Sequence, residues 1–166
     1  MNIFVLDYMS EDAAKMLCDK HIVKMPLESA QMLSSVWHRY GYGDKVQYKE
    51  AFKNHPCTLW AGDSFGNYNW LWYHGLELCF EYTRRYNKIH KCQQVIMDLS
   101  YDKTPFDFES SIRTPHVQCM PDHYKDDDPV RAYRKYYIGD KSEIATWNKV
   151  INTKPYWMEK EEQQYV

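Results

Sequence analysis

The sequence predicts an all-α fold, a single compact helical domain (1–166) with long irregular loops, from two periodic apolar segments and the placement of its prolines. One apolar pattern lies between Ser10 and Tyr40, and the other lies between Tyr68 and Lys91. With 166 residues, 44% of them hydrophobic and 16% aromatic, the chain can form a sizeable core without disulfides or a metal. We find no linker, repeat or second domain in the sequence.

The first helical unit is expected to begin at Ser10, because a serine followed by two acidic residues is typical of a helix N-terminus. It is expected to run toward Lys24, to kink or restart at Pro26, and to continue to about Tyr40. Breakers such as glycine and Asn-His-Pro follow, so residues 41–63 are expected to be mostly loop, with one helical turn near Tyr48.

Apolar residues recur at steps of three and four from Tyr68 to Lys91, which predicts the longest helix, with one buried face. We expect this helix to pack against the first unit, which contains Val23, Leu27 and Trp37. A shorter helix is expected from Cys92 to Leu99, and the prolines and turn-forming residues from 100 to 128 indicate a long irregular segment.

Near the C-terminus, Asp128 followed by a proline indicates an N-cap and first turn, and predicts a helix that ends at Gly139. Asp140 and Glu143 resemble a capping box for a further helix to about Ile151. Residues 156–166 read as a charged tail.

The composition excludes several classes of protein. The formal net charge of −2 lacks the basic excess of proteins that bind duplex nucleic acid without specificity. The N-terminus does not resemble a signal peptide, and no apolar run is long enough to span a membrane. The five cysteines form no CxxC pair, which suits reduced thiols. We therefore expect a cytoplasmic protein without a membrane partner, and the sequence leaves its oligomeric state open.

A polar stripe follows one face of the first helical unit, and the rest of that helix is apolar. It faces either solvent or a wet cleft, because burial of unpaired polar groups is costly. The stripe consists of His21, Lys24, Glu28, Gln31, Ser35 and His38.

The cleft interpretation predicts a catalytic group of Lys24, His21, Asp19 and Glu28, because an amine, an imidazole and carboxylates within two turns can move protons or hold an anion. The plain alternative is that Lys24 and Glu28 form an ordinary surface pair. We expect the cleft to gain a second wall from His55 or Asp122.

Binding candidates come from the loops and the basic patches. Asn54 and His55 belong to an Asn-His-Pro-Cys motif that is either a structural turn or part of a pocket. The candidate substrate-binding residues are His55, Asn54, Asp122, Arg84, Arg131 and Arg134. Cys18 and His21 lack a second ligand pair at zinc spacing, so we expect no metal and no cofactor.

Three segments together resemble the small all-helical pyrimidine-dimer DNA glycosylases of the phage endonuclease V type, and uncharacterised phage proteins that carry the same label. They are Ser10 to Gln31 with its proline, His55 to His90 with its aromatic helix, and the basic, tyrosine-rich run from Tyr133 to Lys141. The resemblance implies an endonuclease V-like fold.

In that family the amine of a processed N-terminal threonine attacks the sugar, and a glutamate two residues before the proline assists. This chain has Asn2 and Lys24 at the corresponding positions. Lys24 could therefore act as a nucleophile, with Asp19 or Glu28 as acid or base, or it could stay charged and hold a phosphate.

The sequence thus favours a phage-type enzyme that acts on a base or sugar of DNA or of a nucleotide, by glycosylase/lyase or base-modifying transfer chemistry. Its partner would be DNA or a nucleotide, and its location the host cytoplasm. The alternative is a non-catalytic phage protein that binds DNA, a nucleotide or a host protein through the same cleft.

Overall fold

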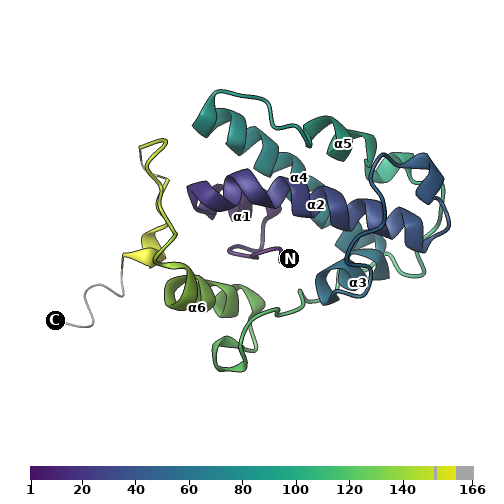
Figure 1. Cartoon of the computed structure of the whole chain (residues 1–166). Helices are drawn as coiled ribbons and strands as arrows, with labels where there is room; N and C mark the ends of the chain where they lie inside the picture. The colour runs from purple at the N-terminus through teal and green to yellow at the C-terminus, as the bar shows by residue number, and fades with distance from the viewer. Residues whose placement is uncertain (152, 160–166) are drawn as a thin grey trace.

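The computed structural model describes residues 1–151 and 153–159, and within these ranges the secondary structure is helical, without strands. The predicted all-α class is therefore confirmed. The α-helices are α1 (Ser10–Met16), α2 (Asp19–Arg39), α3 (Pro56–Asp63), α4 (Phe65–Tyr86), α5 (Gln93–Asp98) and α6 (Pro129–Lys141) (Figure 1). Short 3-10 turns lie at Gly43–Lys45, Tyr101–Lys103, Asp122–Tyr124 and Tyr156–Met158. No described helix is long and apolar enough to cross a bilayer.

The first helical unit is broken before Pro26, contrary to the expected kink. Leu17 and Cys18 adopt extended backbone conformations between α1 and α2, and the Cys18 N–H donates to the Tyr137 hydroxyl at 3.0 Å. Pro26 lies inside the 21-residue α2. A proline removes one backbone donor, and the long packed helix tolerates that loss.

The segment after α2 contains more helix than its glycines and its Asn-His-Pro sequence predict. Residues 56–63 form α3, because the His55 Nδ1 accepts the Cys57 N–H at 3.1 Å and Pro56 occupies the first turn. The same Asn-His-Pro sequence that suggested a loop is thus a helix start. The helical turn expected near Tyr48 lies slightly earlier, at Gly43–Lys45.

The prediction for α4 is confirmed, because it is the longest helix of the described chain. The Ser64 hydroxyl caps its N-terminus by accepting the Asn67 N–H at 3.1 Å. Asn87, in the left-handed conformation, ends the helix, so its last residue, Tyr86, lies five residues before Lys91. Helix α4 packs most extensively against α2 and α1. Trp37 joins α2 to α4 through its indole N–H, which donates to the Tyr68 hydroxyl at 2.8 Å.

The buried face of α2 differs from the predicted one. Of the apolar residues that the sequence pattern gave to this helix, Val23 and Leu27 are 44% and 41% exposed, whereas Trp37 is buried. The apolar side chains of α2 that are buried in the core are Ile22, Met25, Met32, Leu33 and Val36, together with Trp37. The helix is apolar over such a wide arc that its pattern did not show which side faces α4.

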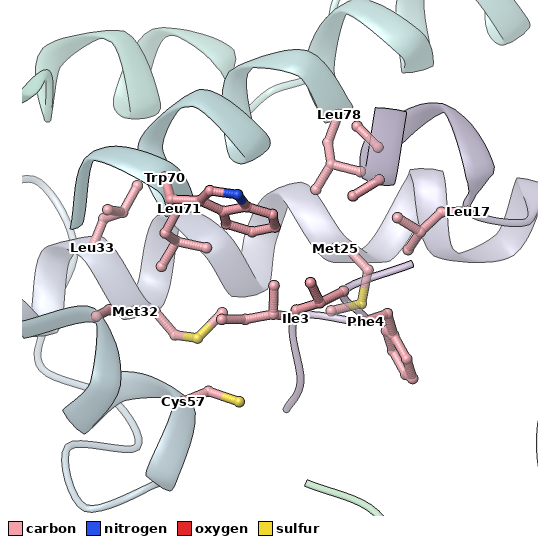
Figure 2. Packing of buried hydrophobic residues seen from close by; sticks show 14 of the residues in the cluster. Ile3, Phe4, Leu17, Met25, Met32, Leu33, Cys57, Trp70, Leu71 and Leu78 are labelled. Atoms are coloured by element: carbon pink, nitrogen blue, oxygen red, sulfur yellow. The ribbon is translucent and has the colours of Figure 1, made fainter. Parts of the chain in front are cut away.

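The N-terminal segment lies in the middle of the molecule, on the side of α2 that faces α6 (Figure 1). Residues 3–6 are buried although they form no helix. Ile3 and Phe4 belong to the same apolar cluster as Met25 of α2 and Leu71 of α4 (Figure 2). The start of the chain is therefore part of the core and passes close to α2.

The C-terminal part agrees with the sequence only as far as α6. Asp128 caps α6 as expected, accepting the Val130 N–H at 2.9 Å, but the helix continues past Gly139 to Lys141. The helix expected to 151 is absent, and the Asp140 carboxylate instead accepts the Tyr124 hydroxyl at 2.7 Å. Of the expected tail, Trp157 is buried, and residues 160–166 lie outside the described range.

Candidate functional site

A cavity of about 890 Å³ lies where the start of α2 meets the end of α6 and the segment that follows. Lysines line it from both sides: Lys20 and Lys24 on α2, Lys141 on α6, and Lys149 on the segment beyond. We call this space the lysine cavity. Its other lining residues include Asp19, His21, Tyr86 and Asn148.

The far wall of the lysine cavity is attached to α1 and α2 by three hydrogen bonds. The Asp19 N–H donates to the Thr146 carbonyl at 2.8 Å, and the Asn148 N–H donates to the Asp19 carboxylate at 2.7 Å. The Trp147 indole N–H donates to the Met16 carbonyl at 3.1 Å. These contacts hold Lys149 opposite Lys20 and Lys24 without a regular helix.

Asp19 lies at the base of the cavity in a buried ionic network. The Arg85 guanidinium is fully buried and lies 3.2 Å from the Asp19 carboxylate and 2.8 Å from Glu81. It also donates to the Leu17 carbonyl at 2.7 Å. Asp19 therefore anchors α2 to α4 and to the cavity wall.

His21 is buried and is held in one orientation. Its Nδ1 lies 2.7 Å from the Tyr137 hydroxyl, and its ring stacks on Phe4 with centroids 4.4 Å apart. Burial, followed by the charges of Lys141, Lys24 and Lys20, lowers the pKa of His21 to about 4. The imidazole is thus neutral at pH 7.

Glu28 lies one turn after Lys24, and two amino groups and one backbone N–H surround its carboxylate. Lys24 Nζ lies 3.4 Å from Oε1, and the Asn2 backbone N–H donates to Oε2 at 2.9 Å. The amino group of Met1 lies 3.9 Å from the same Oε2. The Lys24 side chain is 66% exposed, whereas that of Glu28 is only 10% exposed, so a buried carboxylate faces an accessible amine.

Lys24 connects the two parts of the site, because it lines the lysine cavity and pairs with Glu28. We call Lys24, Glu28 and the two N-terminal nitrogens the Glu28 cluster. Of the predicted catalytic group, Asp19, His21 and Lys24 line the cavity and Glu28 lies beside it. His55 and Asp122 do not line the lysine cavity, so the expected second wall comes instead from residues 141–149.

The other loop candidates lie elsewhere. Asn54 lines a separate cavity of about 460 Å³ together with Ser35 and His38 of the polar stripe. Asp122 is exposed and pairs with Lys125 at 2.8 Å. His55 is near the Glu28 cluster: burial first, and then the Met1 amino group, lower its pKa, whereas Glu28 raises it.

The three candidate arginines are already engaged within the protein. Arg84 contacts Glu81 at 2.5 Å, Arg131 contacts Asp126 at 2.7 Å, and Arg134 contacts Asp7 at 3.1 Å. A phosphate would have to compete with these carboxylates for each arginine. The lysines of the cavity are therefore better placed to meet an anion than the arginines singled out by the sequence.

Sequence reasoning did not single out the groups that long-range packing adds. Lys141 and Lys149 belong to the C-terminal segment, and Asn2 reaches Glu28 only because the N-terminal segment passes beside α2. His55, Cys57 and Cys119 present ligand atoms that all lie within 4.8 Å of one another. The Asn-His-Pro-Cys motif pointed to the first two, but nothing local pointed to Cys119.

Comparison with protein families gives one result. Residues 1–94 match the family model described as pyrimidine dimer DNA glycosylase. The chain belongs to this family. The match spans α1 to α4 and contains the whole Glu28 cluster, whereas the lysine cavity also needs residues beyond it. No curated protein and no solved structure matches the chain.

The Glu28 cluster can be compared with the arrangement that the sequence resemblance implied for this family. The position two residues before Pro26 carries Lys24, but Glu28, two residues after it, brings a carboxylate to within 4 Å of two amino groups. An amine beside a carboxylate is the pairing that the sequence resemblance implied for the family. In this chain an amine and a carboxylate also lie side by side, with the carboxylate two residues after the proline.

Proposed function

We propose that this protein is an enzyme that acts on a base or sugar of DNA, with Glu28 as its acid–base group and Lys24 as its nucleophilic amine. The observation that carries the proposal is the 3.4 Å contact between an accessible amine and a buried carboxylate in a chain of the glycosylase family. The Glu28 carboxylate would accept a proton from the Lys24 ammonium, and the free amine would attack C1′ of a deoxyribose. The bond from C1′ to the base would break with its electron pair leaving on the base, which would then take up the proton held by Glu28.

The lysine cavity supports DNA as the partner. Lys20, Lys141 and Lys149 bring positive charge to a concave surface that Lys24 also lines, although the chain as a whole is slightly acidic. Phosphates can bind such a local cluster of lysines. Each phosphate contact that is lost reduces the slope of log K against log salt concentration by about one unit. The five free thiols support a reducing compartment, in keeping with the expected host cytoplasm.

The test is trapping with borohydride on DNA that carries a pyrimidine dimer or an abasic site. An imine between an amine and the opened sugar is reduced to a stable adduct, and peptide mapping locates it. We expect the adduct on Lys24 in the wild type, its loss in Lys24→Ala, and much slower formation in Glu28→Gln. Lys15→Ala is the matched control, because Lys15 forms a similar pair one helical turn apart, with Glu11, and does not line the lysine cavity.

An adduct on the amino group of Met1 would refute the role of Lys24 while keeping that of Glu28. If no adduct forms on either DNA, with DNA binding intact, the glycosylase/lyase proposal fails. Lys24→Arg separates the remaining roles, since arginine keeps the charge but is not a nucleophile. Full activity in Lys24→Arg would mean that Lys24 holds a phosphate.

The second candidate is a protein that binds DNA, a nucleotide or a host protein without catalysis. The observation in its favour is the lysine cavity itself, where Lys20, Lys141 and Lys149 offer charge for binding and where His21 is neutral at pH 7. It predicts that Lys141→Ala and Lys149→Ala each weaken DNA binding and flatten its salt dependence. Arg131→Ala is the control, because Arg131 is paired with Asp126.

A further inference from the structure

Three side chains with metal-binding atoms meet beside α3, in a position that the proposed chemistry does not use. His55 is the N-cap of α3, Cys57 lies in its first turn, and Cys119 comes from the irregular segment 62 residues later. Their ligand atoms all lie within 4.8 Å of one another, and the two Sγ atoms are 3.5 Å apart. Figure 2 shows Cys57 extending from α3 toward the N-terminal segment.

This geometry is close to that of a tetrahedral zinc site. With Zn–S bonds of about 2.3 Å, two sulfurs of a tetrahedral site lie about 3.8 Å apart, so the observed separation needs a change of only a few tenths of an ångström. Two thiolates and an imidazole are ligands that suit zinc. Calcium and magnesium are bound by oxygen ligands instead, so they do not fit this set.

The backbone fixes the three ligands independently of any ion. The Cys119 N–H donates to the Tyr133 hydroxyl at 3.2 Å, and its carbonyl accepts from the Asn2 side-chain amide at 2.8 Å. His55 and Cys57 are held by the start of α3. The cysteine brought in by the long irregular segment is therefore already fixed in place, and an ion would not have to order it.

We propose that His55, Cys57 and Cys119 form a three-ligand site for zinc, whose fourth position is open to solvent. Cys57 is fully buried, whereas His55 and Cys119 are partly exposed, so one side of the site is accessible. Binding would release the two thiol protons to solvent as two Zn–S bonds form. It would also replace the hydrogen bond in which His55 Nδ1 accepts the Cys57 N–H, because a neutral metal-bound imidazole has no second acceptor.

The zinc site would lie next to the Glu28 cluster without being part of it. The Asn2 side chain contacts Cys119, and its Oδ1 lies 4.0 Å from Cys57 Sγ, while the Asn2 backbone N–H donates to Glu28. A zinc ion here would stabilise the junction of the N-terminal segment, α3 and the irregular segment. The site does not depend on the proposed DNA chemistry.

The experiment uses the full chain, reduced and metal-free, with Co²⁺ as a spectroscopic probe and Zn²⁺ as competitor. We expect one Co²⁺ per chain, with thiolate charge-transfer and tetrahedral d–d bands that Zn²⁺ abolishes, and a higher Tm with Zn²⁺. The ligand variants are Cys119→Ser and His55→Asn, the latter chosen because asparagine is itself a good N-cap and keeps the start of α3. Both should lose the bands.

Cys92→Ser is the matched control, because Cys92 is a buried cysteine that contacts the Tyr48 hydroxyl away from this cluster. It should keep the bands and the rise in Tm. Absence of thiolate bands in the folded wild type, or bands that persist in Cys119→Ser, would overturn the proposal. Loss of the bands in Cys92→Ser but not in His55→Asn would place the metal elsewhere and would equally refute it.

Discussion

Three buried histidines should make this protein sensitive to mild acid. Burial is the main cause that lowers the pKa of His21 to about 4, of His74 to about 4 and of His116 to about 3. His74 Nδ1 lies 3.0 Å from the Ser10 carbonyl. Neither ring nitrogen of His116 has a hydrogen-bond partner among the described residues, and the ring stacks on Trp60. All three imidazoles are therefore held neutral in the folded protein.

The direction of the effect follows from proton linkage. Between about pH 6.5 and pH 4 the unfolded chain binds protons at these histidines and the folded chain does not, so the free energy of unfolding falls as the pH falls. At pH 5 each histidine lies about 1.5 pH units below its unfolded pKa, which corresponds to about 2 kcal/mol. Three such groups give about 6 kcal/mol, a large share of the roughly 5–15 kcal/mol typical of a folded domain.

Carboxylates do not produce a loss of stability in this window. Hydrogen bonds to Arg131 and Lys135 lower the pKa of Asp126. The pKa of Glu81 is also lowered, because its contacts with Arg84 and Arg85 outweigh its desolvation. The stability that such groups add is present above the unfolded pKa and is lost only below about pH 4. The lowered pKa of the Cys119 thiol adds to a fall between pH 8 and pH 5, so the part of the fall that His116→Phe removes is the part that reports on a histidine.

The assay is urea unfolding followed by tryptophan fluorescence at pH 8 and pH 5, at one ionic strength. We expect a much lower midpoint at pH 5. His116→Phe keeps an aromatic ring between the tryptophans and should remove about 2 kcal/mol of the difference, whereas exposed His123→Gln should change it little. Equal stability at the two pH values, or an undiminished difference in His116→Phe, would refute the reasoning.

Two further predictions concern the core. Arg85→Met should lower the free energy of unfolding by about 3–5 kcal/mol, because it leaves buried Asp19 without its cation and leaves Glu81 with Arg84 alone. Arg84→Met, at a half-exposed arginine, should cost about 1 kcal/mol or less. Denaturant melts of both variants would measure the two losses, and equal losses would contradict this. Gly66→Ala should destabilise by about 1–3 kcal/mol, because its new Cβ would lie 2.5 Å from the backbone nitrogen of Arg113. Gly75→Ala, whose Cβ would meet the nearest side-chain atom at 3.1 Å, should cost less, and the reverse order in thermal melts would count against this packing.

Local signals in the sequence determined much of the helical framework. The three- and four-residue apolar steps located α2 and α4, and the caps at Ser64 and Asp128 belong to residue types that favour helix starts. These signals act within one or two turns, so they can be read without the fold. They failed where a local pattern had two outcomes, as at His55, where the same residues suit a turn or a helix start.

Only the tertiary structure decided which polar groups meet. Glu28 gains its partners from the first residues of the chain, Asp19 gains Arg85 from 66 residues away, and Cys57 meets Cys119 across 62 residues. Such pairs depend on how helices pack and how irregular segments run, and the spacing of apolar residues in the sequence predicts neither. The sequence by itself therefore placed Lys24 and Glu28 on one face of a helix, because that relation is local, while the cavity in front of Lys24 and the cysteine opposite Cys57 exist only because packing brings distant segments together.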